Sequence, residues 1–264
     1  MKNLFSLEGR TALITGGSRG LGKMIAEGFL AHGARVWISS RKSADCDATA
    51  AELSAGGGFC RALPQDVSTV EGCQALAAAI GAREAQLDIL VNNAGAAWAA
   101  KFETFPERGW DKVLDLNLKS PFFLTQALLP LLAKAASPER PAKVINVASI
   151  EGLTVSPLPS YSYQVSKAGL VHLTRVMASR LARDHIAVSA IAPGYFPSEM
   201  NTEARDDPEA SASKVPLGRT GSAEDMAGAA VYLASRAGDY VVGSTLTVDG
   251  GIAYATKVPS TGWL

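Results

Sequence analysis

The 264-residue sequence predicts a single α/β domain built on a doubly wound, seven-stranded parallel sheet. Short apolar runs alternate with segments of helical periodicity along nearly the whole chain, which is typical of a parallel sheet with helices on both faces. Right-handed crossovers between such strands make the sheet doubly wound. The sequence contains no internal repeat and no linker that would divide residues 1–264, so we expect one domain.

The predicted elements follow one another closely until residue 195. Strands are expected, in chain order, at residues 12–14, 35–40, 62–63, 87–91, 144–147, 187–192 and 245–248. Helices are expected after residue 22 and at residues 49–55, 70–84, 110–136, 162–182 and 224–235. Residues 195–215 are polar and have few apolar anchors, so we expect an irregular, mobile lid over a substrate.

The composition narrows the class of protein. Hydrophobic residues make up 47% of the chain and charged residues 19%, which argues against disorder. The 25 basic residues balance the 25 acidic ones without a basic stripe, so nucleic acid is not an expected partner. Residues 1–6 do not resemble a signal peptide and no apolar run has membrane-spanning length. We therefore expect a cytoplasmic protein that does not contact membranes.

Three cysteines, Cys46, Cys60 and Cys73, lack the spacing of metal ligands. They are interpreted as free thiols in a reducing compartment, and no metal site is expected.

The first strand leads into a glycine-rich turn that is typical of dinucleotide binding. Gly16 allows a sharp turn, Gly20 allows backbone to approach a pyrophosphate, and Gly22 allows the next helix to pack closely on the sheet. The N-terminus of that helix would direct its free N–H groups at the phosphates. The alternative is a tight strand–helix turn without a ligand. The context favours a Rossmann-type fold.

The end of the second strand indicates which dinucleotide is bound. NAD enzymes usually place a carboxylate here for the ribose 2′-hydroxyl. This chain instead has Ser39 and Ser40 followed by Arg41, and a guanidinium can pair with a 2′-phosphate. Arg19, in the glycine-rich turn, is a second candidate for that contact. The sequence therefore predicts NADP(H).

Polar residues also follow the third and fourth strands. The Asp66 carboxylate is placed to accept the adenine amino group, although capping of a helix near Ser68 is the commoner role for such a residue. Asn92, Asn93, Ala94 and Gly95 close the fourth strand, where polar side chains and a glycine suit a cofactor pressed against backbone. The alternative for this segment is a plain turn.

The candidate catalytic residues lie at the fifth strand and the following helix. Tyr163 and Lys167 are four residues apart, which places them on one helical face. An ammonium beside a phenol lowers the pKa of the phenol, so Tyr163 can serve as a general acid. Ser149 ends the strand and can donate a hydrogen bond to the same substrate oxygen. The alternative is an exposed Tyr–Lys pair; Tyr161 has Val165, not a lysine, at that spacing.

Asn117 lies inside the predicted helix 110–136. Because asparagine is a poor helix former, a polar role is plausible there, with a solvated helix face as the alternative.

Together these motifs resemble the short-chain dehydrogenase/reductase family along nearly the whole chain. The similarity rests on Thr15-Gly16-x-x-x-Gly20-x-Gly22, Asn92-Asn93-Ala94-Gly95, Asn117, Ser149, Tyr163-x-x-x-Lys167, Pro193-Gly194 and Val248-Asp249-Gly250-Gly251. Within the family the chain is most similar to 3-oxoacyl-acyl-carrier-protein reductases of the rhamnolipid-pathway branch. That similarity rests on residues 5–7, 87–91 and 193–198.

The resemblance implies hydride transfer between a nicotinamide and a carbonyl or secondary alcohol. It implies that Tyr163 is the general acid/base, that Lys167 tunes it and binds ribose, that Ser149 polarises the carbonyl and that Asn117 anchors a proton-relay water. The implied cofactor contacts are Gly16, Ser18, Arg19, Gly20, Leu21, Arg41, Asp66, Val67, Asn93, Ala94, Gly95, Tyr163, Lys167, Pro193, Gly194, Phe196 and Ser198. Ser198 stands where the family often has threonine, and the hydroxyl is kept.

The residues that can surround the reacting carbonyl are mostly apolar: Trp98, Ile150, Leu153, Val155, Leu158, Tyr195, Phe196 and Met200. Glu151 is the one charge close by and is expected to point to solvent. An apolar wall favours a 3-oxoacyl thioester or β-keto ester over a polyhydroxylated sugar. The alternatives are a polyol or sugar-acid (gluconate-type) dehydrogenase and a non-catalytic nucleotide-binding sensor or scaffold.

Two further expectations concern partners. Apolar residues beyond one face of the helices 110–136 and 162–182, including Leu124, Leu128, Leu131 and Leu170, suggest a subunit contact, and the resemblance implies a homotetramer to which residues 258–264 contribute. Reductases of carrier-bound substrates have basic residues near the end of the catalytic helix. Asp184 weakens that patch and puts docking of an acyl-carrier protein in doubt.

Overall fold

A computed structural model describes residues 3–255. Its centre is a parallel sheet in the order β3-β2-β1-β4-β5-β6-β7, confirming the predicted seven strands. The strands are β1 (Thr11–Thr15), β2 (Arg35–Ser39), β3 (Cys60–Ala62), β4 (Ile89–Asn92), β5 (Ala142–Val147), β6 (Ile186–Pro193) and β7 (Thr245–Val248). The strand order reverses between β1 and β4, where ligands bind in doubly wound folds.

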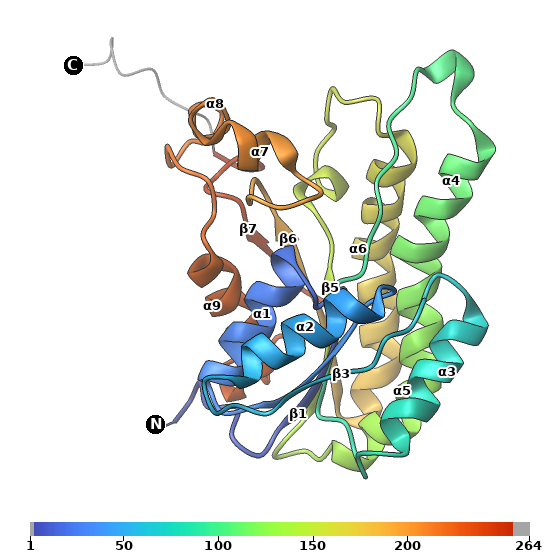
Figure 1. Ribbon diagram of the computed structural model, residues 1–264, viewed down its shortest axis with the longest axis vertical. Helices are drawn as coiled ribbons and strands as arrows, with labels where there is room; N and C mark the ends of the chain where they lie inside the picture. The colour runs from blue at the N-terminus through green and yellow to red at the C-terminus, as the bar shows by residue number, and fades with distance from the viewer. Residues whose placement is uncertain (1–2, 256–264) are drawn as a thin grey trace.

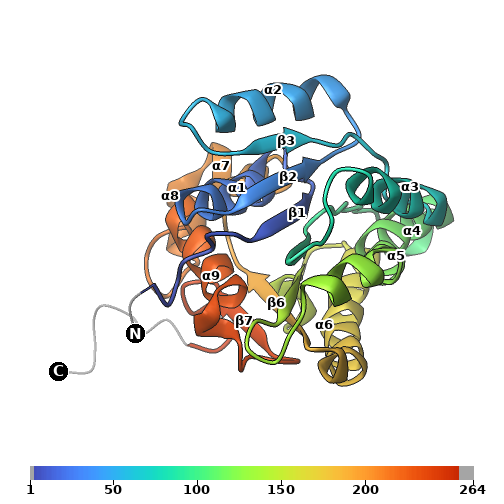
Figure 2. The same ribbon diagram turned by 90° about the horizontal axis from the view of Figure 1, so that it is seen from below.

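Helices cover both faces of this sheet (Figure 2). One layer contains α1 (Gly20–Ala31), α2 (Ser43–Ser54) and α9 (Ala223–Ala234). The other contains α3 (Val70–Gly81), α5 (Ser120–Ala135) and α6 (Tyr161–Leu181). None of the helices within residues 3–255 combines the length and hydropathy needed to cross a membrane.

The central strands are largely apolar because both faces of the sheet are buried there. Ala12 and Ile14 pack toward α1 and α9, whereas Leu13, between them, packs toward α3 and α5. All three side chains are fully buried. This two-sided burial explains why these strands are continuous apolar runs rather than alternating patterns.

The predicted long helix 110–136 is interrupted. It consists of α4 (Glu107–Leu114), a π-helical turn (Asp115–Lys119) and α5. In the π turn the Ser120 N–H bonds to the Asp115 carbonyl, five residues back, which widens the helix locally. Asn117 lies within this turn.

The expected lid is more ordered than predicted. Residues 195–215 contain α7 (Thr202–Asp206) and α8 (Pro208–Ser213), which lie at the end of the sheet where β6 ends (Figure 1). Phe196, Ala204 and Val215 are buried and anchor the segment. The expectation of an irregular stretch was therefore wrong, whereas the apolar anchors are few, as expected; movement as a lid stays a prediction.

The leucines predicted to form a subunit contact belong to the core of the chain itself. Leu124, Leu128 and Leu170 are buried, and Leu131 packs against the same sheet layer. The exposed apolar side chains of these helices are Phe122, Val165 and Val176. Residues 258–264, also proposed for that contact, lie outside the described part of the chain.

Candidate active site

The glycine-rich turn after β1 packs against the segment that follows β4. Gly16 and Gly20 have positive φ angles of 64° and 52°, which favour glycine. A Cβ atom on Gly16 would lie 2.8 Å from Asn93 Nδ2 and 3.0 Å from Ala94 Cα. A Cβ on Gly22 would collide with the Gly16 carbonyl oxygen. The three glycines thus permit a turn that no larger side chain allows at these positions.

Asn93 holds this turn in place. Its Nδ2 donates to the carbonyls of Thr15 and Gly16 at 2.8 and 3.1 Å. The backbone N–H groups of Asn93 and Ala94 donate to Thr15 Oγ1 at 3.1 and 3.0 Å. Asn92, by contrast, bonds to Asn146 and Thr125 inside the sheet layer. Of the two asparagines, only Asn93 therefore shapes the predicted cofactor site.

Two cations flank the turn. Arg19 precedes α1 and Arg41 follows β2; both are exposed, and neither makes an ion pair among residues 3–255. Nearby, the Ser18 carbonyl accepts from Thr49 Oγ1 at 2.9 Å, which joins α2 to the turn. The hydroxyl of Ser39, at the end of β2, is buried without a hydrogen-bond partner. A glycine cradle, free guanidinium groups and an unpartnered hydroxyl fit a phosphorylated dinucleotide.

The Asp66 carboxylate is exposed and accepts from the Ser68 N–H at 3.0 Å. The N-cap of α3 is Thr69, whose side chain accepts from Gly72 N, so Asp66 forms a local turn and does not cap the helix.

Several other predicted cofactor residues have buried or packed side chains. Val67 is buried, Leu21 packs on the core, and the Phe196 ring packs on Gly221 within the core. These three residues can offer a cofactor backbone atoms but not an exposed side chain. Pro193 ends β6, and Gly194 N–H donates to Val248 O at 3.0 Å. Ser198 lies opposite the glycine-rich turn, with its Cβ 3.4 Å from the Cβ position of Gly20.

Ser149, Tyr163 and Lys167 meet at the carboxyl end of β5. Ser149 lies two residues beyond that strand, and Tyr163 and Lys167 lie on one face of α6. The Ser149 hydroxyl lies near enough to the Tyr163 phenol to lower the pKa of that phenol. Lys167 Nζ lies 5.6 Å from the centre of the Tyr163 ring and donates to the Val147 carbonyl at 2.7 Å. The predicted catalytic trio is therefore brought together by this fold.

The protonation states differ from the prediction. Burial raises the pKa of the Tyr163 phenol to about 12; the Ser149 hydrogen bond opposes this shift and the charge of Glu151 adds to it. Burial lowers the pKa of the Lys167 ammonium to about 8. The expected net lowering of the pKa of Tyr163 is not found, because desolvation of the buried phenol outweighs the opposing effect of Ser149. Both groups keep their protons at neutral pH.

The side chain of Asn117 is fully engaged with protein. Its Oδ1 accepts from Ala96 N at 2.8 Å, and its Nδ2 donates to Ala96 O at 2.9 Å and to Ser166 Oγ at 3.0 Å. A Cβ on Gly95 would lie 3.4 Å from Asn117 Oδ1 and 3.8 Å from Lys167 Nζ. Asn117 is thus close to the catalytic lysine, but its amide joins the loop after β4 to α6; the solvated-face alternative is excluded.

Glu151 does not point to solvent, contrary to the expectation. It is half-buried, and its Oε2 accepts from the buried Ser160 hydroxyl at 3.2 Å. Sequence reasoning missed this contact because Ser160 lies nine residues away across an irregular loop.

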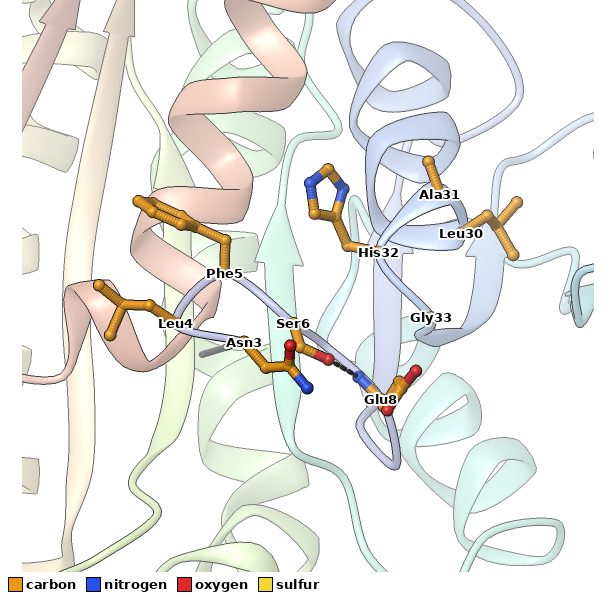
Figure 3. A pocket seen from close by; sticks show the side chains of 9 residues that line it. All are labelled: Asn3, Leu4, Phe5, Ser6, Glu8, Leu30, Ala31, His32 and Gly33. Carbon is orange, nitrogen blue, oxygen red and sulfur yellow. Dashed lines mark hydrogen bonds between the residues drawn. The ribbon is translucent and has the colours of Figure 1, made fainter. Parts of the chain in front are cut away.

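Two hollows on the surface differ in their distance from the predicted site residues. The larger is lined by residues 3–6, Glu8 and residues 30–33 (Figure 3) and lies at the C-terminal end of α1. It is therefore at the opposite end of α1 from the glycine-rich turn and holds none of the predicted site residues. A second hollow, at the carboxyl ends of β6 and β7, is lined by Tyr195, Phe196 and residues 247–251, among others. Phe196 lies two residues before Ser198 in the chain, so this hollow adjoins the predicted cofactor site. No group of three potential metal-ligating side chains occurs among the residues that the structure describes.

Comparison with known proteins agrees with this geometry. A family model described as enoyl-(acyl carrier protein) reductase matches residues 16–253. The chain is 48% identical to the rhamnolipids biosynthesis 3-oxoacyl-(acyl-carrier-protein) reductase of Pseudomonas aeruginosa, over 95% of this chain and 99% of that protein. It is 34% identical to gluconate 5-dehydrogenase of Gluconobacter oxydans, over 95% and 97% of the two chains. The solved Pseudomonas aeruginosa RhlG/NADP active-site complex matches with a TM-score of 0.92 and 48% identity, over 96% of this chain and all of that one.

These similarities, together with the Ser149–Tyr163–Lys167 arrangement, define a class. The chain belongs to the short-chain dehydrogenase/reductase family and is an oxidoreductase.

Proposed function

We propose that this protein is an NADPH-dependent reductase of 3-oxoacyl thioesters or similar β-keto esters. The reaction type is supported by the convergence of Ser149, Tyr163 and Lys167 beside the glycine-rich turn. The use of NADPH is supported by Arg19 and Arg41, and by the presence of NADP in the complex named above. A non-catalytic nucleotide-binding sensor is disfavoured because binding alone does not require Ser149, Tyr163 and Lys167 to converge.

In the proposed reaction the cofactor provides the hydride and residues of the chain provide the proton. Bound NADPH supplies the hydride for the carbonyl carbon. Tyr163, protonated at neutral pH, gives its phenolic proton to the carbonyl oxygen, and Ser149 donates a second hydrogen bond to that oxygen. The ammonium of Lys167 then stabilises the phenolate, and solvent returns the proton to Tyr163. The carbonyl has gained one hydride and one proton and leaves as a secondary alcohol.

The proposal of an acyl substrate is supported by exposed apolar side chains at the entrance to the site, which we call its mouth. Val155, Leu158 and Met200 expose 93%, 56% and 51% of their surface on the loops that flank Ser149 and Tyr163. Ile150 and Phe196, also expected in this wall, are instead buried in the core. Exposed apolar side chains at a mouth can cover an acyl chain, whereas a polyol requires several paired polar groups.

A chain-length series tests this proposal. With NADPH and β-keto esters or thioesters of increasing length, kcat/KM should rise until the mouth is covered. Each fully buried methylene contributes about 0.8 kcal/mol, which corresponds to a rise of about fourfold. The comparison series is 5-keto-gluconate and related sugar acids, the substrates suggested by the gluconate 5-dehydrogenase relative. Faster turnover of the sugar acids, or a flat chain-length profile, would contradict the proposal.

We further propose a homotetramer and a closing lid. Phe122, Val165 and Val176 provide exposed apolar surface on α5 and α6 for a subunit contact, and light scattering at micromolar concentration should give about four times the mass of 27.5 kDa. A monomer would exclude this assembly.

For the lid we propose that α7 and α8 move as a unit over the substrate. Asp184 pairs with Arg180 at 2.5 Å and lies 4.0 Å from Arg183, which argues against docking of an acidic carrier protein at that helix end.

A further inference from the structure

Glu151 occupies a position between the two catalytic segments. It follows Ser149 by two residues, and its N–H donates to Ser149 Oγ at 3.2 Å. Its carboxylate accepts from Ser160 Oγ at 3.2 Å, and Ser160 is the N-cap of α6, three residues before Tyr163. Glu151 therefore links the segment after β5 that presents Ser149, through its backbone N–H, to the start of the helix that presents Tyr163, through its carboxylate.

The negative charge of Glu151 has no cationic partner. Within residues 3–255, no lysine, arginine or histidine forms an ion pair with it, and it is the only charged residue between 144 and 166. Its charge is felt at the catalytic phenol, where it adds to the rise in the pKa of Tyr163. An uncompensated, half-buried charge acts over a longer range than an exposed one, because solvent screens it less.

The loop that carries Glu151 is held firmly. Gln164, the neighbour of Tyr163, accepts from Ser156 N–H at 3.0 Å and donates to the Leu158 carbonyl at 3.1 Å. The Ala100 N–H donates to Pro159 O at 3.1 Å. These bonds fix the loop 156–160 and with it the Ser160 hydroxyl, which donates to the Glu151 carboxylate.

We propose that Glu151 selects substrates by charge, repelling those that carry a carboxylate next to the reacting carbonyl and admitting neutral esters and thioesters. This inference rests on the proposed reductase function and deepens it. A keto acid bound for reduction would bring its carboxylate to the same small region as Glu151, whose charge no ion pair offsets because the nearby Lys167 ammonium is hydrogen-bonded to the Val147 carbonyl. The corresponding ester has the same carbonyl and no such charge.

The test uses a keto acid and its methyl ester, which share the reacting carbonyl and differ in the charge of the carboxyl group and in one methyl group. Acetoacetate and methyl acetoacetate are compared with NADPH at pH 8, for the wild type and Glu151→Gln. The glutamine keeps the size of the side chain and an oxygen that can accept from Ser160. We expect the wild type to prefer the ester, and the variant to raise kcat/KM for acetoacetate about tenfold relative to the ester, because one like charge is removed. A change that acts through the pKa of Tyr163 is shared by both substrates and cancels in this ratio. The preference of the wild type should shrink as ionic strength rises.

Glu103→Gln is the matched control. Glu103 is an exposed glutamate in the loop after β4, so the variant makes the same change in net charge and should leave the ester-to-acid ratio unchanged. An unchanged ratio in Glu151→Gln, an equal change for both substrates, or a wild-type preference for the acid overturns the inference. If the wild type reduces neither compound, the proposed function fails, and the same ratio measured on pyruvate and methyl pyruvate, in which the carboxyl group adjoins the ketone, decides the role of Glu151 independently.

Discussion

Replacing Tyr163 with phenylalanine is expected to lower kcat for carbonyl reduction by about 10²–10⁴-fold, the usual contribution of a positioned general acid. The ring remains, so packing at the start of α6 is kept, but the phenolic proton donor near Ser149 is lost. Binding of NADPH, measured by fluorescence titration, should persist. Substantial residual turnover would show that another group protonates the carbonyl.

Tyr161→Phe is the control for that experiment. Tyr161 lies two residues earlier on α6 and packs edge-on against Phe102 and Phe105, with ring centres 5.5 and 5.7 Å away. The change removes a hydroxyl from this aromatic cluster but not from the catalytic trio. Its kcat should therefore remain close to that of the wild type, and a loss as large as that of Tyr163→Phe would mean that the two tyrosines had been assigned wrongly.

The strands and the glycine-rich turn could be predicted because their causes are local. Leu13 and Ile14 lie on opposite faces of β1 and are both buried, so the middle of the strand is a continuous apolar run that is easily recognised. Gly16 and Gly20 have backbone angles that other residues rarely adopt, so their spacing reveals the turn. The catalytic spacing of Tyr163 and Lys167 follows directly from helical geometry.

Other features depend on contacts distant in sequence and were not predictable from local pattern. The π turn around Asn117 is held by Ala96 and Ser166, which are 21 and 49 residues away. Helical periodicity identified Leu124 and Leu128 as apolar but did not say whether the sheet or a second subunit covers them; the sheet does.

The error at Tyr163 has a similar cause. Sequence spacing correctly placed Lys167 beside the phenol, but the direction of a pKa shift depends on burial and on every neighbouring group. Val147 O takes the hydrogen bond of the amine, and Glu151 adds a negative charge from the adjoining loop. Neither contact follows from the spacing of two residues on one helix.

Replacing Arg41 with alanine is expected to raise the KM for NADPH by about 10–100-fold, because a hydrogen-bonded charge pair contributes about 1.5–3 kcal/mol. Arg41 lies two residues beyond Ser39, whose carbonyl accepts from Gly17 N–H at 3.3 Å. This bond places the end of β2 directly beside the glycine-rich turn. A 2′-phosphate bound there meets an exposed guanidinium that has no acidic partner among residues 3–255.

The KM for NADH should change little in the same variant, since NADH lacks the phosphate, and kcat should change little because Arg41 is remote from Ser149 and Tyr163 in the fold. Lys42→Ala removes the same charge one residue along, but Lys42 already faces Asp45 at 3.7 Å, so that control should keep the preference for NADPH. Arg19→Ala measures the second guanidinium at the turn. Because each cation can partly replace the other, the double variant should lose more preference than either single change. If the wild type used NADH and NADPH with equal efficiency, neither Arg41 nor Arg19 would bind a 2′-phosphate, and the preference for NADPH would be refuted.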